Sequence, residues 1–245
     1  MLQGHQTWVF EHQPVIISTG TIGGPFEAEG ELAHAFDILH SDLWLGQDSY
    51  EKAQRVMLEE ATNRAIEKVG LTTKDIHFML AGDLINQVTP SSFACRTLSI
   101  PYVGLFGACS TSMEGLALAS FLVNAQGAER VITAASGHNA ATEKQFRYPT
   151  EYGGQKPPTA QWTATAAGAA IVSKEGEGPV VTSATIGQVV DMGLSDPFNL
   201  GGAMAPAAAE TIEAHFRDRQ IDPTIMMSLL RGISVKLGCR LRVSF

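Results

Sequence analysis

The chain has 245 residues, of which 44% are hydrophobic and 17% charged, and its formal net charge at pH 7 is −8. This composition is typical of a folded protein with a buried core and excludes an intrinsically disordered chain. The negative charge, with no run of Lys and Arg to offset it, argues against a general nucleic-acid-binding protein.

The N-terminal stretch MLQGHQTWVFEHQ lacks a basic segment followed by an apolar one, so we expect no signal peptide. No run of about 18 apolar residues occurs, so we expect no membrane-spanning segment. The three cysteines, at positions 95, 109 and 239, form neither metal-ligand pairs nor a disulfide framework. They indicate a reducing compartment, and we expect the protein to be cytoplasmic.

Short apolar strands alternate with helical patterns along the chain. Strands are predicted at 14–19, 76–81, 102–106, 130–135 and 180–187. Helices are predicted at 49–69, 91–98, 114–124 and 203–217. The alternation predicts an α/β layered fold with a largely parallel central sheet. The aperiodic segment 144–159 is rich in Tyr, Pro and Gly, and we expect it to be a long, functional loop.

The stretch YVGLFGACSTSM at 102–113 places Cys109 between an apolar strand and a helix of small residues. A thiol at a helix N-terminus has a lowered pKa, because unpaired backbone N–H groups and the helix dipole favour the thiolate. Cys109 would then be a nucleophile or part of an anion site. The alternative is a small buried cysteine that packs the junction of strand and helix.

Two stretches of the chain resemble each other. Residues 57–84 predict a helix, a connector and a strand that ends in Gly-Asp-Leu, and residues 203–224 repeat the helix and the connector. The chain then ends in IMMSLLRGISVKLGCRLRVSF. A shifted reading frame would turn Ile225–Ser234 into Asp-Tyr-Asp-Val-Ile-Val-Thr-Gly-Asp-Ile, which matches the first copy. A natural, divergent basic tail is the other interpretation.

Five motifs carry a resemblance to a known family: QTWVFEH (6–12), AGDLINQ (81–87), LFGACSTSMEG (105–115), GHNAATEKQFRYPTEYGGQKP (137–157) and GGAMAPAAAETI (201–212). They closely resemble the stage V sporulation protein AD family of spore-forming bacteria. The resemblance implies a thiolase-like α/β layered fold made of two similar halves. The first half would be complete at 1–200, the second would begin at 201–224, and the tail at 225–245 departs from the family.

The function that this resemblance implies is the binding of dipicolinic acid, pyridine-2,6-dicarboxylate. The family takes dipicolinate up into the developing spore, and the compound is released in germination. The resemblance also implies membrane-protein partners from the same sporulation operon, which would hold the protein peripherally on the spore inner membrane, and a homodimer. Whether dipicolinate is bound free or as its calcium chelate is left open. We expect no cofactor and no protein-held metal, because no acidic cluster has calcium-loop spacing.

Dipicolinate is a planar dianion, so its site needs N–H donors, a cation and a stacking surface. We expect Cys109 and the backbone N–H groups of Ser110 and Thr111 to form an anion site at a helix terminus. Arg147 is expected to bind one carboxylate with two parallel hydrogen bonds, and Tyr148 to stack on the ring. Arg147 could instead form a salt bridge within its own loop.

Polar residues follow two of the predicted strands. His138 and Asn139 come after the strand at 130–135, at the sheet edge where α/β proteins bind ligands. His138 could donate to a carboxylate, or it could be a satisfied loop histidine. Asp83 and Asn86 follow the strand at 76–81 and are expected to line the same crevice. Because Asp83 would repel a dianion, we expect it to orient a donor.

Two other functions stay open. In the thiolase-like superfamily the cysteine that matches Cys109 accepts an acyl group, which would make this chain an acyltransferase or condensing enzyme. The residues that complete that site come from the second half, so we do not expect acyl transfer here. The last alternative is an inactive, truncated remnant, whose exposed strand edge and apolar surface would favour aggregation.

Overall fold

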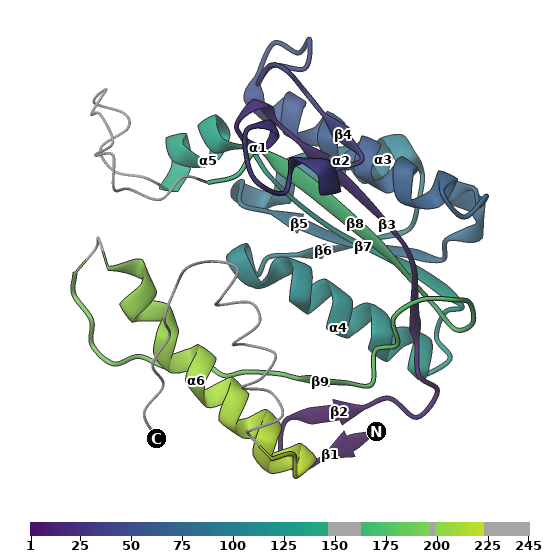
Figure 1. Cartoon of the computed structure of the whole chain (residues 1–245), viewed down its shortest axis with the longest axis vertical. Helices are drawn as coiled ribbons and strands as arrows, with labels where there is room; N and C mark the ends of the chain where they lie inside the picture. The colour runs from purple at the N-terminus through teal and green to yellow at the C-terminus, as the bar shows by residue number, and fades with distance from the viewer. Residues whose placement is uncertain (147–162, 197–198, 223–245) are drawn as a thin grey trace. The chain divides into compact units, whose positions relative to one another are not determined.

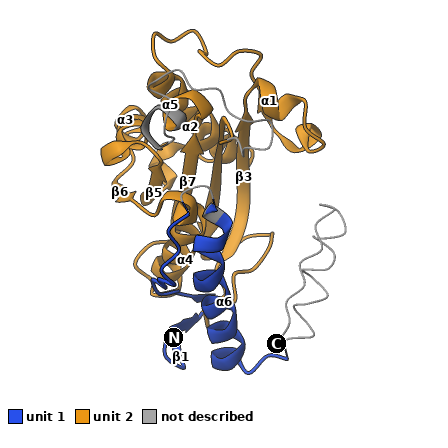
Figure 2. Ribbon diagram, turned by 90° about the vertical axis from the view of Figure 1, so that its left-hand side faces the viewer, with its two compact units in different colours: residues 1–9, 183–245 blue, residues 10–182 orange. Residues whose placement is uncertain are grey.

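The computed structural model describes residues 1–146, 163–196 and 199–222. These form two compact units, coloured separately in Figure 2. The smaller unit joins Met1–Val9 to the chain from Ser183 onward, and the larger unit is Phe10–Thr182. These units are not the predicted halves of the internal repeat. The division into a first half at 1–200, the start of a second half at 201–224 and a tail at 225–245 stays a prediction.

The larger unit is built on a six-stranded sheet with the strand order β4-β3-β8-β7-β5-β6 (Figure 1). The strands are β3 (Val15–Gly23), β4 (Ile38–Leu39), β5 (Phe78–Asp83), β6 (Tyr102–Leu105), β7 (Arg130–Gly137) and β8 (Ala166–Ser173). Strand β8 runs antiparallel to both β3 and β7, whereas the other pairs are parallel. The expected α/β class is confirmed. The sheet is mixed and not largely parallel as predicted, because β8, which the sequence patterns did not predict, runs antiparallel to both of its neighbours.

Helices cover both faces of this sheet. Helices α2 (Tyr50–Glu67) and α3 (Thr89–Leu98) lie on one face and α4 (Thr111–Asn124) on the other (Figure 1). The strands alternate to match, since Met79 and Ala81 of β5 join the core cluster of α2 and α3 while Leu80 joins that of α4. Strand β5 is therefore buried on both faces, as its continuous apolar run indicates.

The residues at the two ends of helix α2 explain where the helix begins and ends. The Ser49 hydroxyl accepts a hydrogen bond from the Lys52 N–H at 3.2 Å and caps the first turn. At the other end Gly70 adopts φ +66°, and the Leu71 N–H donates to the Ile66 carbonyl at 3.1 Å. The helix predicted at 49–69 is thus confirmed with ends that differ by one or two residues.

The remaining elements of the larger unit are short helices. They are α1 (Pro25–Ala28), η1 (Ala33–Ala35), η2 (Thr73–Asp75), η3 (Asn86–Val88), η4 (Ala108–Ser110) and α5 (Asn139–Phe146). The start of the long loop predicted at 144–159 was wrong, because α5 extends to Phe146. Residues 147–159 of that loop lie outside the described residues.

The smaller unit packs a helix on a three-stranded antiparallel sheet. Its elements are β1 (Leu2–Gln3), β2 (Thr7–Val9), β9 (Ser183–Thr185) and α6 (Leu200–Arg219), with the sheet order β1-β2-β9. The buried Asp218 carboxylate of α6 accepts hydrogen bonds from the Gln6 N–H at 3.2 Å and the Thr7 hydroxyl at 3.0 Å. These bonds join the first residues of the chain to the helix, and sequence patterns did not predict them.

The ends of α2 and α6 share one geometry. Gln220 has φ +52°, like Gly70 in the first copy, and the Ile221 N–H donates to the Phe216 carbonyl at 3.2 Å. The same pattern of bonds closes α2. The two helices thus end in the same kind of turn. The repeat itself stays a prediction, and the strand expected after α6 lies outside the described residues. Within the described residues, no helix is both long and apolar enough to cross a membrane.

Candidate functional site

The carboxyl ends of the parallel strands in the larger unit meet at one edge of the sheet. Asp83 at the end of β5 pairs with Ser136 of β7, and Gly82 pairs with Leu105 at the end of β6. The predicted ligand-binding residues that the structure describes lie at or after these strand ends, so the structure brings them to the same edge. This is the place where open α/β sheets bind ligands.

Cys109 lies in the short helix η4 on this edge, and it is exposed. The two N–H groups expected to face an anion are already used. The Ser110 N–H donates to the Gly107 carbonyl at 3.0 Å, and the Thr111 N–H donates to the Ala108 carbonyl. The tight η4 turn precedes α4 and occupies these donors, which sequence spacing did not reveal. Cys109 is therefore an exposed thiol, and the alternative of a buried packing residue is wrong.

The Thr111 side chain points into the protein. It is 1% exposed, and its hydroxyl has no hydrogen-bond partner. Its methyl group lies so close to β5 that a Cβ on Gly82 would be 2.9 Å from it. Thr111 therefore packs α4 against the sheet.

Asp83 is buried and ties its strand to the next helix. Its Oδ1 accepts from the Ile85 N–H at 2.8 Å, and its Oδ2 accepts from the Ser91 N–H at 2.9 Å and hydroxyl at 2.5 Å. Burial raises the pKa of Asp83 above its ordinary value, although these bonds act against the shift. Asn86 opens η3 nearby, where its carbonyl accepts from the Thr89 hydroxyl at 2.9 Å.

His138 is completely buried. Its Nε2 lies 2.8 Å from the Leu43 carbonyl, which can only accept, so Nε2 carries the proton. The ring stacks on Tyr50 with centroids 4.9 Å apart. Burial lowers the pKa of His138, which is therefore neutral at pH 7. In this tautomer Nδ1 is an acceptor without a partner, and no N–H remains to donate to a carboxylate. The bond to Leu43 matches the alternative of a structural loop histidine, although only Nε2 of the ring is satisfied.

Asn139 starts a chain of hydrogen bonds that reaches a residue not predicted from sequence. Its N–H donates to the Thr165 hydroxyl at 2.9 Å, and its side-chain amide donates to the Thr163 carbonyl at 3.2 Å. The Thr165 N–H in turn donates to Glu27 Oε1 at 3.0 Å. Glu27 and Thr165 are 138 positions apart, and no local pattern links them.

A cavity of about 330 Å³ lies beside this chain of bonds and is lined by Phe26, Glu27, Thr163 and Ala164. The second carboxylate oxygen of Glu27, Oε2, is buried and has no hydrogen-bond partner. A buried carboxylate oxygen without a donor is costly, so this atom needs an explanation.

Arg147 and Tyr148 lie outside the described residues. The smaller unit has an open cavity of about 610 Å³ of its own, which the polar residues Gln6, Glu210 and Arg217 help to line. Within the described ranges, no group of three or more His, Cys, Asp or Glu side chains could hold a metal ion.

Comparison with protein families gives a match over most of the chain. The model of a family described as Stage V sporulation protein AD matches residues 4–242. The Stage V sporulation protein AD of Bacillus subtilis (strain 168) is 51% identical over 217 residues, which cover 89% of this chain and 64% of the relative. The chain thus spans less than two thirds of the length of that curated relative.

Similar solved structures include 3-oxoacyl-[acyl-carrier-protein] synthase III from Aquifex aeolicus VF5. It has 16% identity and a TM-score of 0.47, and the match covers 67% of this chain and 55% of that one. The synthase III from Xanthomonas oryzae pv. oryzae has 11% identity and a TM-score of 0.44, with coverage of 68% and 57%.

Proposed function

Because the chain belongs to the stage V sporulation protein AD family, we propose that it serves spore formation as a non-catalytic dipicolinate-binding protein. It would take part in dipicolinate uptake into the developing spore and in release during germination. The observation that carries this proposal is the 51% identity over 217 residues to a sporulation protein. The family match at 4–242 includes every residue proposed for the site.

The geometry narrows which residues would bind the dianion. The N–H groups of Ser110 and Thr111 are used within the turn, and His138 has no N–H to spare. We propose that Arg147 supplies the positive charge, because a guanidinium matches a carboxylate with two parallel bonds and a lysine does not. The exposed Cys109 thiol and the ring of Tyr148 would complete the contacts. Asp83 holds the sheet edge in shape and stays out of contact with the ligand.

Partners form the second part of the proposal. We place the protein in the cytoplasm, peripheral on the spore inner membrane through membrane proteins of the same operon. A homodimer would form through β6, which is an edge strand of the six-stranded sheet. Val103 on this strand is 46% exposed, and Phe106 and Met113 beside it are 71% and 65% exposed. Such an unpaired edge with an apolar border favours pairing with a second copy.

Calorimetric titration with dipicolinate tests the function. We expect saturable binding that picolinate, with one carboxylate fewer, reproduces at least tenfold more weakly, because a charge-assisted pair contributes about 1.5–3 kcal/mol. Arg147→Lys should weaken dipicolinate binding, because Lys cannot form two parallel bonds, while Arg96→Lys serves as the control. Absence of binding at millimolar dipicolinate, or equal affinity for picolinate, would contradict the proposal.

An acyltransferase is the second candidate, and the exposure of Cys109 is the observation that favours it. An enzyme of this kind would form a thioester between the Cys109 sulfur and the acyl group of acyl-CoA, with free CoA as the leaving group. Intact-protein mass spectrometry after incubation with acetyl-CoA separates the two functions. An acyl adduct that Cys109→Ala abolishes would favour the enzyme, and an unmodified protein would favour ligand binding.

A further inference from the structure

A chain of hydrogen bonds in the smaller unit runs from a carboxylate of α6 through two strands to a histidine of the same helix. Asp218 Oδ2 lies 3.0 Å from the Thr7 hydroxyl of β2, and that hydroxyl lies 2.8 Å from the Thr185 hydroxyl of β9. Thr185 Oγ1 in turn lies 2.7 Å from His215 Nδ1. Asp218 and Thr7 are buried, and His215 is half-buried. The four side chains form a continuous polar connection between α6, β2 and β9.

The carboxylate sets the direction of every bond in this chain. An ionised carboxylate only accepts, so the single hydroxyl proton of Thr7 goes to Asp218. Thr7 Oγ1 must then accept from the Thr185 hydroxyl, whose only proton is used there. Thr185 Oγ1 is left to accept from the ring, so His215 Nδ1 carries a proton and donates. Neutral His215 is therefore held as the Nδ1–H tautomer, and Nε2 is the nitrogen that takes up a further proton.

Two charged side chains of α6 act on His215, whereas strands β1, β2 and β9 carry no charged side chain. Burial and the positive charge of Arg219 lower the pKa of His215, and the negative charge of Asp218 opposes them. Burial by itself would raise the pKa of Asp218, but the hydrogen bonds that it accepts and the charge of Arg217 hold it below the ordinary value of 3.8. Near neutral pH the chain of bonds thus joins a neutral imidazole to an ionised carboxylate.

Arg219 also ties α6 to the first strand. Its Nη1 donates to Gln3 Oε1 of β1 at 3.0 Å, and its Nε is buried without a hydrogen-bond partner. A positive charge on His215 would repel this guanidinium, which could move away only by breaking its bond to Gln3. Proton uptake at His215 therefore opposes a contact that joins α6 to β1.

We propose that His215 is a proton-sensitive link between α6 and the N-terminal strands β1 and β2. The neutral ring closes the chain of hydrogen bonds, and the protonated ring favours separation of the strands from the helix. Because the pKa of His215 is lowered in the closed state, that state has its full stability above the ordinary value of 6.5. It loses stability as the pH falls from there to the lowered value. This link does not depend on dipicolinate binding.

Hydrogen exchange of the Gln6 backbone amide tests the link, because this N–H donates to the Asp218 carboxylate at 3.2 Å. The protection factor, which is corrected for the intrinsic pH dependence of exchange, reports how often the bond opens. Between about pH 7.5 and about pH 5.5 we expect it to fall at least about twofold, and by at most about tenfold per pH unit, because a single proton is taken up. A protection factor that stays constant over this range would overturn the proposal.

Two histidine variants assign the effect to one ring. Asparagine has an N–H group near the position of the histidine Nδ1 and does not titrate, so His215→Asn should keep the bond to Thr185 and abolish the fall. His5→Asn changes an exposed histidine between β1 and β2 and should leave the fall unchanged. The same behaviour of both variants, or loss of the fall in His5→Asn alone, would overturn the proposal.

Nitrogen-15 NMR spectra of the imidazole test the link without changing the ring. We expect the neutral ring to carry its proton on Nδ1 and the titration midpoint of His215 to lie below 6.5. Arg219→Gln keeps a donor for Gln3 and removes the charge, so it should raise this midpoint. A proton on Nε2 of the neutral ring, or a midpoint that Arg219→Gln does not raise, would overturn the proposal.

Discussion

The Asp83 carboxylate accepts two hydrogen bonds from Ser91, one from the backbone N–H at 2.9 Å and one from the hydroxyl at 2.5 Å. This relationship joins the end of β5 to the first turn of α3 and shapes the sheet edge that carries the candidate site. Because both oxygens of Asp83 accept from N–H or O–H donors, the position requires a group with two accepting atoms.

Asp83→Asn should therefore destabilise the fold. One oxygen becomes an NH₂ group that faces the Ile85 or Ser91 donors, and an unsatisfied buried group costs about 1–3 kcal/mol. The free energy of unfolding from urea titration measures the change. Asp42→Asn is the matched control, because a single oxygen of Asp42 accepts both of its backbone bonds and an amide retains it. Equal stability of Asp83→Asn and the wild type would contradict this role.

The two described cysteines should differ sharply in reactivity. Cys95 is 3% exposed, its thiol donates to the Met79 sulfur at 3.3 Å, and burial raises its pKa to about 12. Cys109 is exposed. In a Cys239→Ser background we expect one thiol to react quickly with Ellman's reagent at pH 8 and a second only after unfolding in urea.

Cys109→Ser in that background should remove the fast reaction and leave the slow one. Two fast thiols in the folded protein, or loss of the slow reaction in Cys109→Ser, would contradict the assignment.

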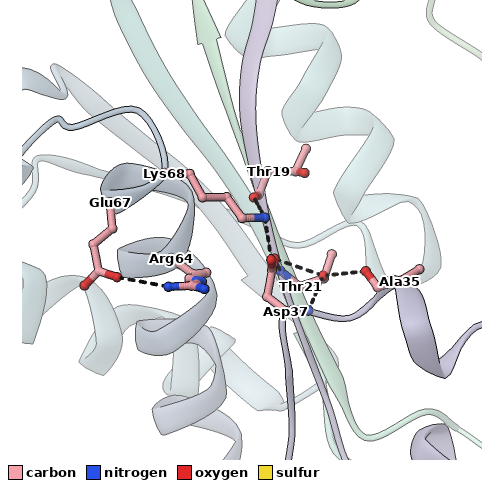
Figure 3. Close-up of polar contacts among 7 residues, drawn as sticks. All are labelled: Thr19, Thr21, Ala35, Asp37, Arg64, Glu67 and Lys68. Carbon is pink, nitrogen blue, oxygen red and sulfur yellow. Dashed lines mark hydrogen bonds and ion pairs between the residues drawn. The ribbon is translucent and has the colours of Figure 1, made fainter.

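An ion pair between Asp37 and Lys68 should make stability depend on acid pH. The Lys68 Nζ lies 2.5 Å from Asp37 Oδ1 and donates to the Thr19 carbonyl, while the Thr21 N–H donates to Asp37 (Figure 3). Burial by itself would raise the pKa of Asp37, but the bonds from Lys68 and Thr21 together hold it below the ordinary value of 3.8. The native state then binds fewer protons at this site than the unfolded state.

The stabilisation is therefore complete above the ordinary pKa of aspartate and is lost as the pH falls through the lowered one. Lys68→Gln should lower the free energy of unfolding at pH 7 by about 1 kcal/mol. The difference should shrink as the pH falls below 3.8, the ordinary value for Asp37. Lys52→Gln breaks an exposed pair with Asp48 and should have a smaller effect. A deficit for Lys68→Gln that does not change with pH would contradict the assignment.

The β6 edge should determine the oligomeric state. Val103→Lys places a charge on the exposed edge strand, and edge lysines oppose strand pairing. We expect light scattering after gel filtration to show a dimer for the wild type and a monomer for this variant. Leu32→Lys, at an exposed position outside β6 and before β4 in the chain, should leave the dimer intact. A monomeric wild type, or a dimeric Val103→Lys, would contradict the expected interface. Large aggregates of the wild type would instead support the alternative that this chain is an inactive, truncated remnant.

Strand β8 shows where sequence patterns fall short. Residues 166–170 are Ala-Ala-Gly-Ala-Ala, a composition with little preference for strands. The segment forms a strand because β3 and β7 pair with it on both sides and α2 packs over it. Helix α2 and strand β5, by contrast, carry their own signals in a cap, a C-terminal glycine and a continuous apolar run.

In the candidate site, too, some features could be predicted from the sequence and others could not. The position of His138 and Asn139 at the sheet edge followed from the strand before them. The His138 Nε2–H, however, donates to the carbonyl of Leu43, which is 95 positions away. Glu27 likewise accepts a hydrogen bond from the N–H of the distant Thr165. These partners are set by tertiary packing, so a pattern of residue types along the chain does not contain them.

We propose that dipicolinate binds at the carboxyl edge of the six-stranded sheet. Nitrogen-15 NMR spectra of the chain, recorded during a titration with dipicolinate, would show the position of this binding site residue by residue. We expect the backbone resonances of Cys109, Ser110 and Asn139 to shift together and to fit a single dissociation constant. An absence of saturable shifts at millimolar dipicolinate, or saturable shifts confined to α6 and its sheet, would contradict the claim.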